Sequence, residues 1–279
     1  MYQQSVTSKD GTPIAYWTSG NGPPLVLVHG TPADHTRWRP LLPYLESHTT
    51  VHAMDRRGRG GSGDGSEYAL EREYEDVAAV VDAVAEASGS AVDVYGHSHG
   101  GICAFGGATL TSNIRKLVLY EGWALPNPEV YALPADLEER MDALLASGDL
   151  DAVVETLFRE LESMSEEDLS ALRSAPSWPG RVAAAPTITR ELRAERGARL
   201  DPEQAAKITG PVLLTDRRAQ LRPIQSGHPD GGGRAARRPD RSARGPGARR
   251  GHPCPEDFFR VCHGFPAREL MGSPNRLRT

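Results

Sequence analysis

Five consecutive residues in the middle of the chain, Gly96-His97-Ser98-His99-Gly100, restrict the possible folds more than any other segment. They follow a short apolar run at 91–95, typical of a buried strand, and precede a small-residue stretch at 101–108, typical of a helix. Glycines on both sides of a serine permit a very sharp turn that exposes its hydroxyl. The following helix would direct free N–H groups at the charge formed when Ser98 attacks a carbonyl. We interpret Ser98 as a nucleophile; the alternative is a glycine-rich turn with an incidental serine.

Strand and helix patterns alternate along the first half of the chain, which predicts an α/β fold with a doubly wound, mostly parallel sheet. A continuously apolar strand is expected where helices cover both faces of a sheet. Residues 1–19 alternate around Asp10-Gly11 and predict a hairpin at the sheet edge. The other predicted strands are 24–28, 51–54, 91–95 and 114–120, and helical spacing is present at 38–45 and 70–88.

Two further motifs accompany the sharp turn at 96–100, which we call the elbow. The strand Pro24-Leu25-Val26-Leu27-Val28 runs into His29-Gly30-Thr31-Pro32, and a later strand runs into Asp55-Arg56-Arg57-Gly58-Arg59-Gly60-Gly61-Ser62. In order and spacing, these segments and the elbow together resemble the α/β-hydrolase family over roughly residues 1–216. The resemblance implies a hydrolase with a serine nucleophile, no cofactor and a helical cap inserted into the sheet.

The chain divides by pattern into five parts. Residues 1–123 form the first part of the core. Residues 124–207 contain amphipathic helices without a strand pattern, where the resemblance implies the cap. An apolar strand resumes the core within 208–216. An irregular segment follows at 217–254, and 255–279 resembles a remnant of the family's last helix.

The segment after the last predicted strand has an unusual composition. Residues 217–251 contain ten arginines, seven glycines and four prolines, with no lysine or aromatic residue. Such a segment buries too little apolar surface to offset its chain entropy. We interpret it as a coding frame that slipped near residue 216 and recovered near 254. The alternatives are a basic arm that binds an acidic partner and a divergent loop.

The resemblance implies the remaining catalytic groups. The oxyanion hole would be the backbone N–H groups of Thr31 and His99, each directly after its motif. The acid would be Asp216, the carboxylate directly after the last predicted strand, with Glu121 in reserve at the end of the preceding strand. The base would be His252, although it precedes Pro255 too closely for the family's pattern. The alternative is a chain that lacks a competent base.

No metal or cofactor is expected. The two histidines beside Ser98 occupy elbow positions, and no further histidine or cysteine accompanies them with metal-ligand spacing. His29 is expected to be a buried histidine that bonds to backbone. Trp178 and Arg181 either face the pocket from the cap or pack within the cap.

The composition excludes several classes of protein. The net charge is −5 and three cysteines give no disulfide framework, so neither a nucleic-acid partner nor a secreted scaffold is indicated. No signal peptide or membrane span is apparent, which favours a cytoplasmic location. We therefore predict a serine hydrolase that cleaves a small carboxylic ester through an acyl-enzyme on Ser98. The alternatives are an impaired or non-catalytic hydrolase scaffold, a carbon–carbon bond hydrolase, and a haloperoxidase-like enzyme.

Overall fold

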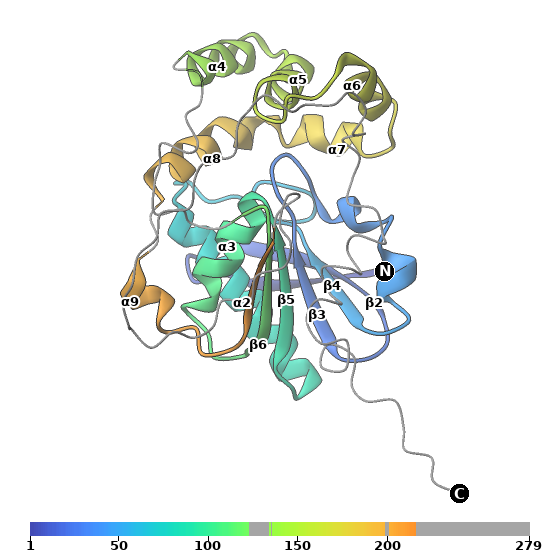
Figure 1. The fold of residues 1–279 in the computed structure, drawn as a ribbon, viewed down its shortest axis with the longest axis vertical. Helices are drawn as coiled ribbons and strands as arrows, with labels where there is room; N and C mark the ends of the chain where they lie inside the picture. The colour runs from blue at the N-terminus through green and yellow to red at the C-terminus, as the bar shows by residue number, and fades with distance from the viewer. Residues whose placement is uncertain (123–133, 135, 199–200, 216–279) are drawn as a thin grey trace, which may run out of the picture.

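The computed structural model describes residues 1–122, 134, 136–198 and 201–215, which form a central sheet with helices around it (Figure 1). Within these residues the sheet has seven strands in the order β1-β2-β4-β3-β5-β6-β7. The first two strands pair antiparallel, as do β2 and β4, and all other neighbours are parallel. The mostly parallel α/β fold predicted from the sequence is confirmed. The strands are β1 (Tyr2–Thr7), β2 (Pro13–Gly20), β3 (Pro24–Val28), β4 (Thr50–Met54), β5 (Val92–His97), β6 (Ile114–Tyr120) and β7 (Val212–Thr215).

The two faces of the sheet are covered by different helices, because successive residues of a strand point to opposite sides. Val26 and Val28 lie in one apolar cluster with residues of α2 (Leu70–Ser88) and α3 (His99–Ala108). Leu27, between them, lies in a second cluster with residues of η1 (His35–Trp38) and α1 (Leu42–Leu45). The apolar run at 24–28 is therefore buried on both faces, as its sequence predicts.

Helix α2 covers the span that helical spacing predicts. Its inward residues Val77, Val80, Val81 and Val84 are at most 1% exposed. The helix ends at Gly89, which takes the left-handed conformation with φ 66° that glycine adopts without strain. Apolar spacing and the terminal glycine together determine both the face and the end of this helix.

The structure corrects the expectation of one helix at 38–45. Trp38, Leu41, Leu42 and Leu45 are all buried, but the segment forms the short 3₁₀ helix η1 and then α1. Prolines at positions 40 and 43 lack the N–H that a continuous helix needs, so one helix cannot run through both.

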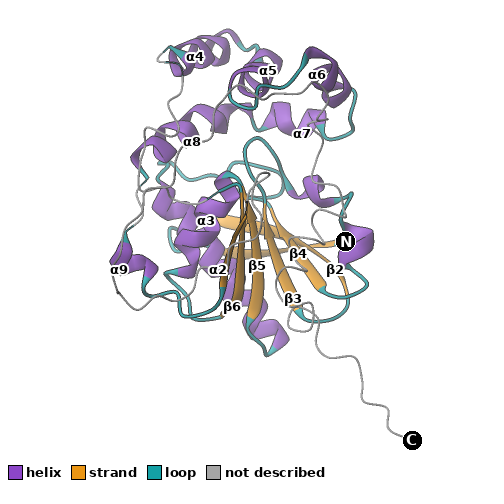
Figure 2. Cartoon of the chain, in the orientation of Figure 1, coloured by secondary structure: helices purple, strands orange, loops and turns teal. Residues whose placement is uncertain are grey.

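The helices of the predicted cap pack around a core of their own. Their shared cluster includes Leu137, Met141, Phe158, Trp178 and Ile188. Figure 2 shows these helices in a layer beyond the sheet, and no strand lies within 136–198 in the described part of the chain. The cap helices are α4 (Leu137–Ser147), α5 (Leu150–Glu160), α6 (Glu166–Arg173), α7 (Trp178–Ala183) and α8 (Ala185–Gly197).

After the cap, the short helix α9 (Pro202–Ala205) leads back to the sheet (Figure 1). Ile208 packs against the same apolar cluster as α2 and α3. The predicted boundary at 123–124, the segment 217–254 and the remnant 255–279 lie outside the described residues. Across the residues that are described, no helix combines the length and apolar character needed to cross a bilayer.

Candidate active site

Ser98 lies on a sharp turn between the end of β5 and the start of α3. Its backbone has φ 55° and ψ −131°, a region that non-glycine residues rarely adopt. A Cβ on Gly96 would lie 2.6 Å from the carbonyl oxygen of Gly100, and a Cβ on Gly100 would clash with backbone of β3 and His29. The two glycines therefore permit the turn, which is the local geometry that the sequence predicts.

Backbone hydrogen bonds hold this turn at the edge of the sheet. The N–H of Ser98 donates to Tyr120 O on the neighbouring strand β6 at 2.8 Å. The carbonyl oxygen of Ser98 accepts from Gly101 N at 2.7 Å, which closes the first turn of α3. Strain at a single residue persists where its surroundings fix it in this way.

Thr31 and His99 take the positions in which the resemblance places the oxyanion hole. His99 is the first residue of α3, and Thr31 follows Gly30, whose Cα faces the side chain of Ser98. Within the described residues, no hydrogen-bond acceptor receives the backbone N–H of Thr31 or that of His99. Unpaired N–H groups beside a nucleophile are suited to a developing oxyanion.

The two histidines beside Ser98 have different surroundings. The ring of His97 stacks on Tyr120 with centroids 5.5 Å apart, and its Nε2 lies 3.7 Å from the carboxylate of Glu121. His99 is buried; its Nδ1 bonds to Glu195, and its Nε2 lies 3.3 Å from the hydroxyl of Tyr68.

His99 is buried beside carboxylates that favour the protonated form of its ring. Burial, and with it the charge of Arg56, would lower its pKa, but the electrostatic influence of Cys103, Glu191 and Glu195 outweighs both and raises the pKa of His99 to about 10. An imidazolium donates from both ring nitrogens, which suits its bonds to Glu195 and Tyr68. Both ring nitrogens of His99 are thus occupied, so any contribution of this residue to an oxyanion hole would come from its backbone N–H.

His29 is buried and bonded to backbone, as the sequence predicts. Its Nδ1 donates to Gly30 O at 2.9 Å, and its Nε2 accepts from Arg56 N at 3.2 Å. Burial, and then the charges of Arg56 and Arg59, lower the pKa of His29 to about 3. The neutral ring thereby joins the loop after β3 to the loop after β4.

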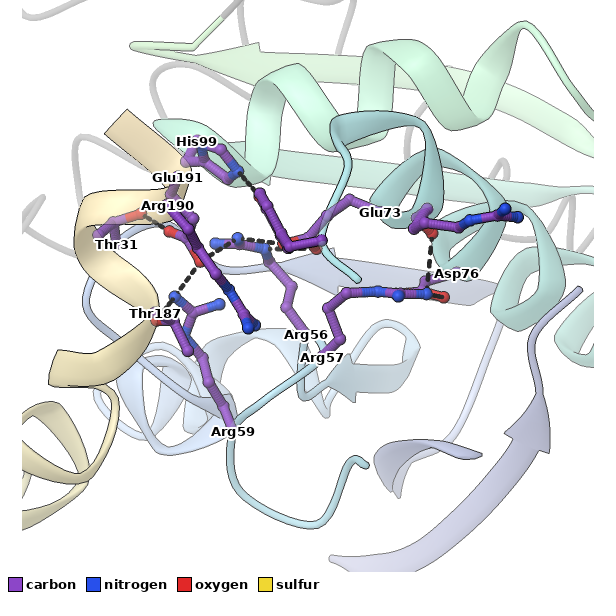
Figure 3. Close-up of polar contacts among 12 residues, drawn as sticks. Thr31, Arg56, Arg57, Arg59, Glu73, Asp76, His99, Thr187, Arg190 and Glu191 are labelled. Carbon is purple, nitrogen blue, oxygen red and sulfur yellow. Dashed lines mark hydrogen bonds and ion pairs between the residues drawn. The ribbon is translucent and has the colours of Figure 1, made fainter. Parts of the chain in front are cut away.

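A buried network of ion pairs lies next to the loop that carries Thr31 and was not predicted (Figure 3). Arg56 contacts Glu73 of α2 at 2.6 Å and Glu191 of the cap helix α8 at 2.8 Å, and all three side chains are fully buried. Glu191 also pairs with Arg59 and accepts the hydroxyl of Thr31. The charges of Arg56 and Arg59 outweigh burial and hold the pKa of Glu191 far below its ordinary value.

The polar face of α8 is the signal that could have revealed this network. Thr187, Glu191 and Glu195 recur at four-residue spacing on one side of the helix. Glu191 is fully buried, and Thr187 bonds to Arg59. A charged stripe on a cap helix is ordinarily a solvated face, so its spacing alone does not identify the partner.

Glu73, His99 and Cys103 form the one buried group with metal-ligand chemistry found among the described residues, with their ligand atoms within 4.8 Å of one another. Arg56 already contacts both carboxylate oxygens of Glu73, at 3.0 and 2.6 Å. Both ring nitrogens of His99 also have partners. The donors are occupied, so this group does not fit a metal ion.

The other residues named from the sequence differ in where they lie and in what they contact. Glu121 lies at the end of β6 with φ 55°, and its N–H donates to Thr215 O. Asp216 and His252 lie outside the described residues. Trp178 packs in the cap core and donates to Asp151, whereas Arg181 donates to Pro32 O, directly after Thr31, at 2.7 Å.

Known proteins share this architecture. The sequence pattern of the family described as "Alpha/beta hydrolase family" matches residues 25–256. The crystal structure of an alpha/beta hydrolase from Sphaerobacter thermophilus DSM 20745 is 38% identical, with a TM-score of 0.65 over 76% of this chain and 81% of that chain.

Two curated relatives match over shorter regions. Pyrrolizixenacetamide deacetylase of Xenorhabdus hominickii is 34% identical over 39% of this chain and 47% of its own length. Cis-3-alkyl-4-alkyloxetan-2-one decarboxylase of Shewanella oneidensis is 27% identical over 49% of this chain and 44% of its own length. The chain thus spans less than half the length of these relatives.

Proposed function

The chain belongs to the α/β-hydrolase family, and on that premise we propose that it is a serine hydrolase that cleaves a small carboxylic ester. The observation that carries the proposal is the backbone of Ser98, held at φ 55° and ψ −131° between β5 and α3. A family member with a serine at this strained turn between strand and helix has the nucleophile that acyl transfer needs.

The proposed reaction has two steps. Ser98 Oγ attacks the ester carbonyl carbon while His252, oriented by Asp216 or in reserve by Glu121, accepts the hydroxyl proton. The N–H groups of Thr31 and His99 stabilise the oxyanion, the C–O bond to the alcohol breaks, and the base returns the proton to the leaving alcohol. Water then attacks the acyl-enzyme in the same way and releases the acid.

A relative supports the choice of acyl chemistry. Pyrrolizixenacetamide deacetylase is by its name an enzyme that removes an acetyl group. Removal of an acetyl group is acyl transfer to water, for which a serine nucleophile and an oxyanion hole are suited. An ester with a small acyl group is therefore the first substrate to assay.

Labelling and turnover test the proposal together. The full chain should react with a fluorophosphonate at Ser98, identified by peptide mass spectrometry, and should hydrolyse p-nitrophenyl acetate. Ser98→Ala should remove both signals, whereas Ser112→Ala, at an exposed serine, should retain them. A chain that is neither labelled nor active would favour the impaired scaffold, and label retained in Ser98→Ala would exclude Ser98 as the nucleophile.

A further inference from the structure

We propose that Glu191 and Glu195 of the cap helix α8 are positioning residues that hold the two arms of the oxyanion hole, so that the hole is complete only when α8 is docked. The two glutamates are one helical turn apart and so lie on one face of α8. Glu191 contacts Thr31, and Glu195 contacts His99. The inference rests on the proposed function, because these are the two residues whose N–H groups would stabilise the oxyanion.

The first arm is the loop that carries Thr31. One carboxylate oxygen of Glu191 accepts the hydroxyl of Thr31, while the other oxygen faces Arg56 and Arg59. Arg56 in turn donates its N–H to the ring of His29, two residues before Thr31. The carboxylate is thus fixed by two cations of the core, and it fixes the Thr31 side chain next to the N–H that the hole needs.

The second arm is the start of α3. The ring of His99 is held between Glu195 of the cap and Tyr68 of the core, and 1% of the residue is exposed. Its ring and its backbone N–H belong to one residue, so a fixed ring restricts the orientation of that N–H. Each arm therefore has one contact from the same face of α8.

Charge balance couples the two contacts to docking of the helix. Three cations, Arg56, Arg59 and His99, meet three carboxylates, those of Glu73, Glu191 and Glu195. Two of these carboxylates come from α8, and without them Glu73 would face three cations in a buried region. An uncompensated buried charge is strongly unfavourable, so the core retains its arrangement only with α8 in place.

The matched variants are Glu191→Gln and Asp64→Asn. The first keeps the shape of the side chain and removes the charge that joins Thr31 to the two arginines. The second removes a different charge pair between α8 and the core, that of Arg190 with Asp64 at 2.7 Å, in which neither residue bonds to Thr31 or His99. Thr31→Val is the second test variant, because it removes one hydroxyl from the contact and leaves the backbone N–H in place.

Two readouts separate a disturbed hole from a loosened cap. The first compares turnover of a p-nitrophenyl ester with that of its thiono analogue, whose sulfur fits an oxyanion hole poorly. Glu191→Gln should lower kcat for the oxygen ester about tenfold to 100-fold with KM within about twofold, and should reduce the preference for oxygen over sulfur. The second readout is hydrogen exchange of the amides at 29–31, 33 and 98–102, which should quicken in this variant and needs no turnover.

The proposal is supported if Glu191→Gln, or Thr31→Val should the first fail to fold, changes both readouts while Asp64→Asn leaves them at the wild-type level. It is overturned if the test variant leaves both unchanged, or if Asp64→Asn changes them equally. If the wild-type chain has no turnover, the proposed function fails, and hydrogen exchange alone decides whether α8 holds the two arms.

Discussion

A Cβ on Gly30 would lie 2.8 Å from the Cβ of Ser98 and 2.9 Å from His97 O. Gly30→Ala must therefore displace either the elbow or the loop that carries Thr31. We expect kcat for p-nitrophenyl acetate to fall about 100-fold, as a misplacement of roughly 1 Å does. Gly197→Ala is the control, since nothing lies within 4 Å of a Cβ there. Equal losses in the two variants would contradict this account of the elbow.

The assignment of the base predicts non-additive losses. If His252 accepts the proton from Ser98, His252→Ala and Ser98→Ala should each lower kcat by about a millionfold, and the double variant should lose no more. Steady-state kinetics on p-nitrophenyl acetate measure this, with His228→Ala as the control histidine. Wild-type turnover in His252→Ala would show that another group, or none, acts as the base.

The buried pair of Arg56 and Glu73 should matter greatly for stability. Glu73→Ala leaves a buried guanidinium short of one carboxylate, and we expect the free energy of unfolding to fall by about 3–5 kcal/mol. Glu75→Ala, on the same helix but paired with the exposed side chains of Lys9 and Arg72, should change it by less than about 1 kcal/mol. Urea unfolding followed by circular dichroism measures both; similar losses would refute the distinction.

His99 should make the folded chain less stable in alkali. Its pKa is raised from 6.5 to about 10 by neighbouring acidic groups that outweigh burial. A group whose pKa is higher when folded contributes its full stability below the unfolded pKa and loses that contribution as pH rises through the folded value. The melting temperature should therefore decline from about pH 6.5 to about pH 10.

Two histidine variants check the source of that decline. His99→Gln should flatten the alkaline slope, because the titrating group is gone. His52→Gln should leave it intact, because burial lowers the pKa of His52 to about 4 and it does not titrate in that range. An unchanged slope in His99→Gln would assign the decline to other groups.

Most of the fold could be predicted because its signals are local. The strand 24–28, the strand 114–120 and the helix 70–88 have the predicted bounds, since apolar periodicity and flanking breakers act within a few residues. The break in 38–45 could not be predicted from spacing alone. Two short helices separated by proline bury apolar residues at the same intervals as one continuous helix.

The candidate site also has one part that local sequence predicts and one part that it does not. The turn at Ser98 depends on two flanking glycines, Gly96 and Gly100, so sequence alone predicts its geometry. Glu191 was missed because its partners Thr31 and Arg59 lie 160 and 132 residues away along the chain. Nothing local in the cap helix identifies such partners. Asp216 and His252 stay predictions.

The distance along the chain between Arg59 and Glu191 also has a consequence for biosynthesis. The ribosome makes Arg59 132 residues before it makes Glu191, and it makes Arg56 slightly earlier still. At about 5–20 residues per second, this interval lasts roughly 7 to 26 seconds. During it Arg59 has no Glu191 to pair with, and Arg56 has only Glu73, where the finished protein has a dry, neutralised interior. Translation of α8 therefore marks the moment at which the amino-terminal half can close.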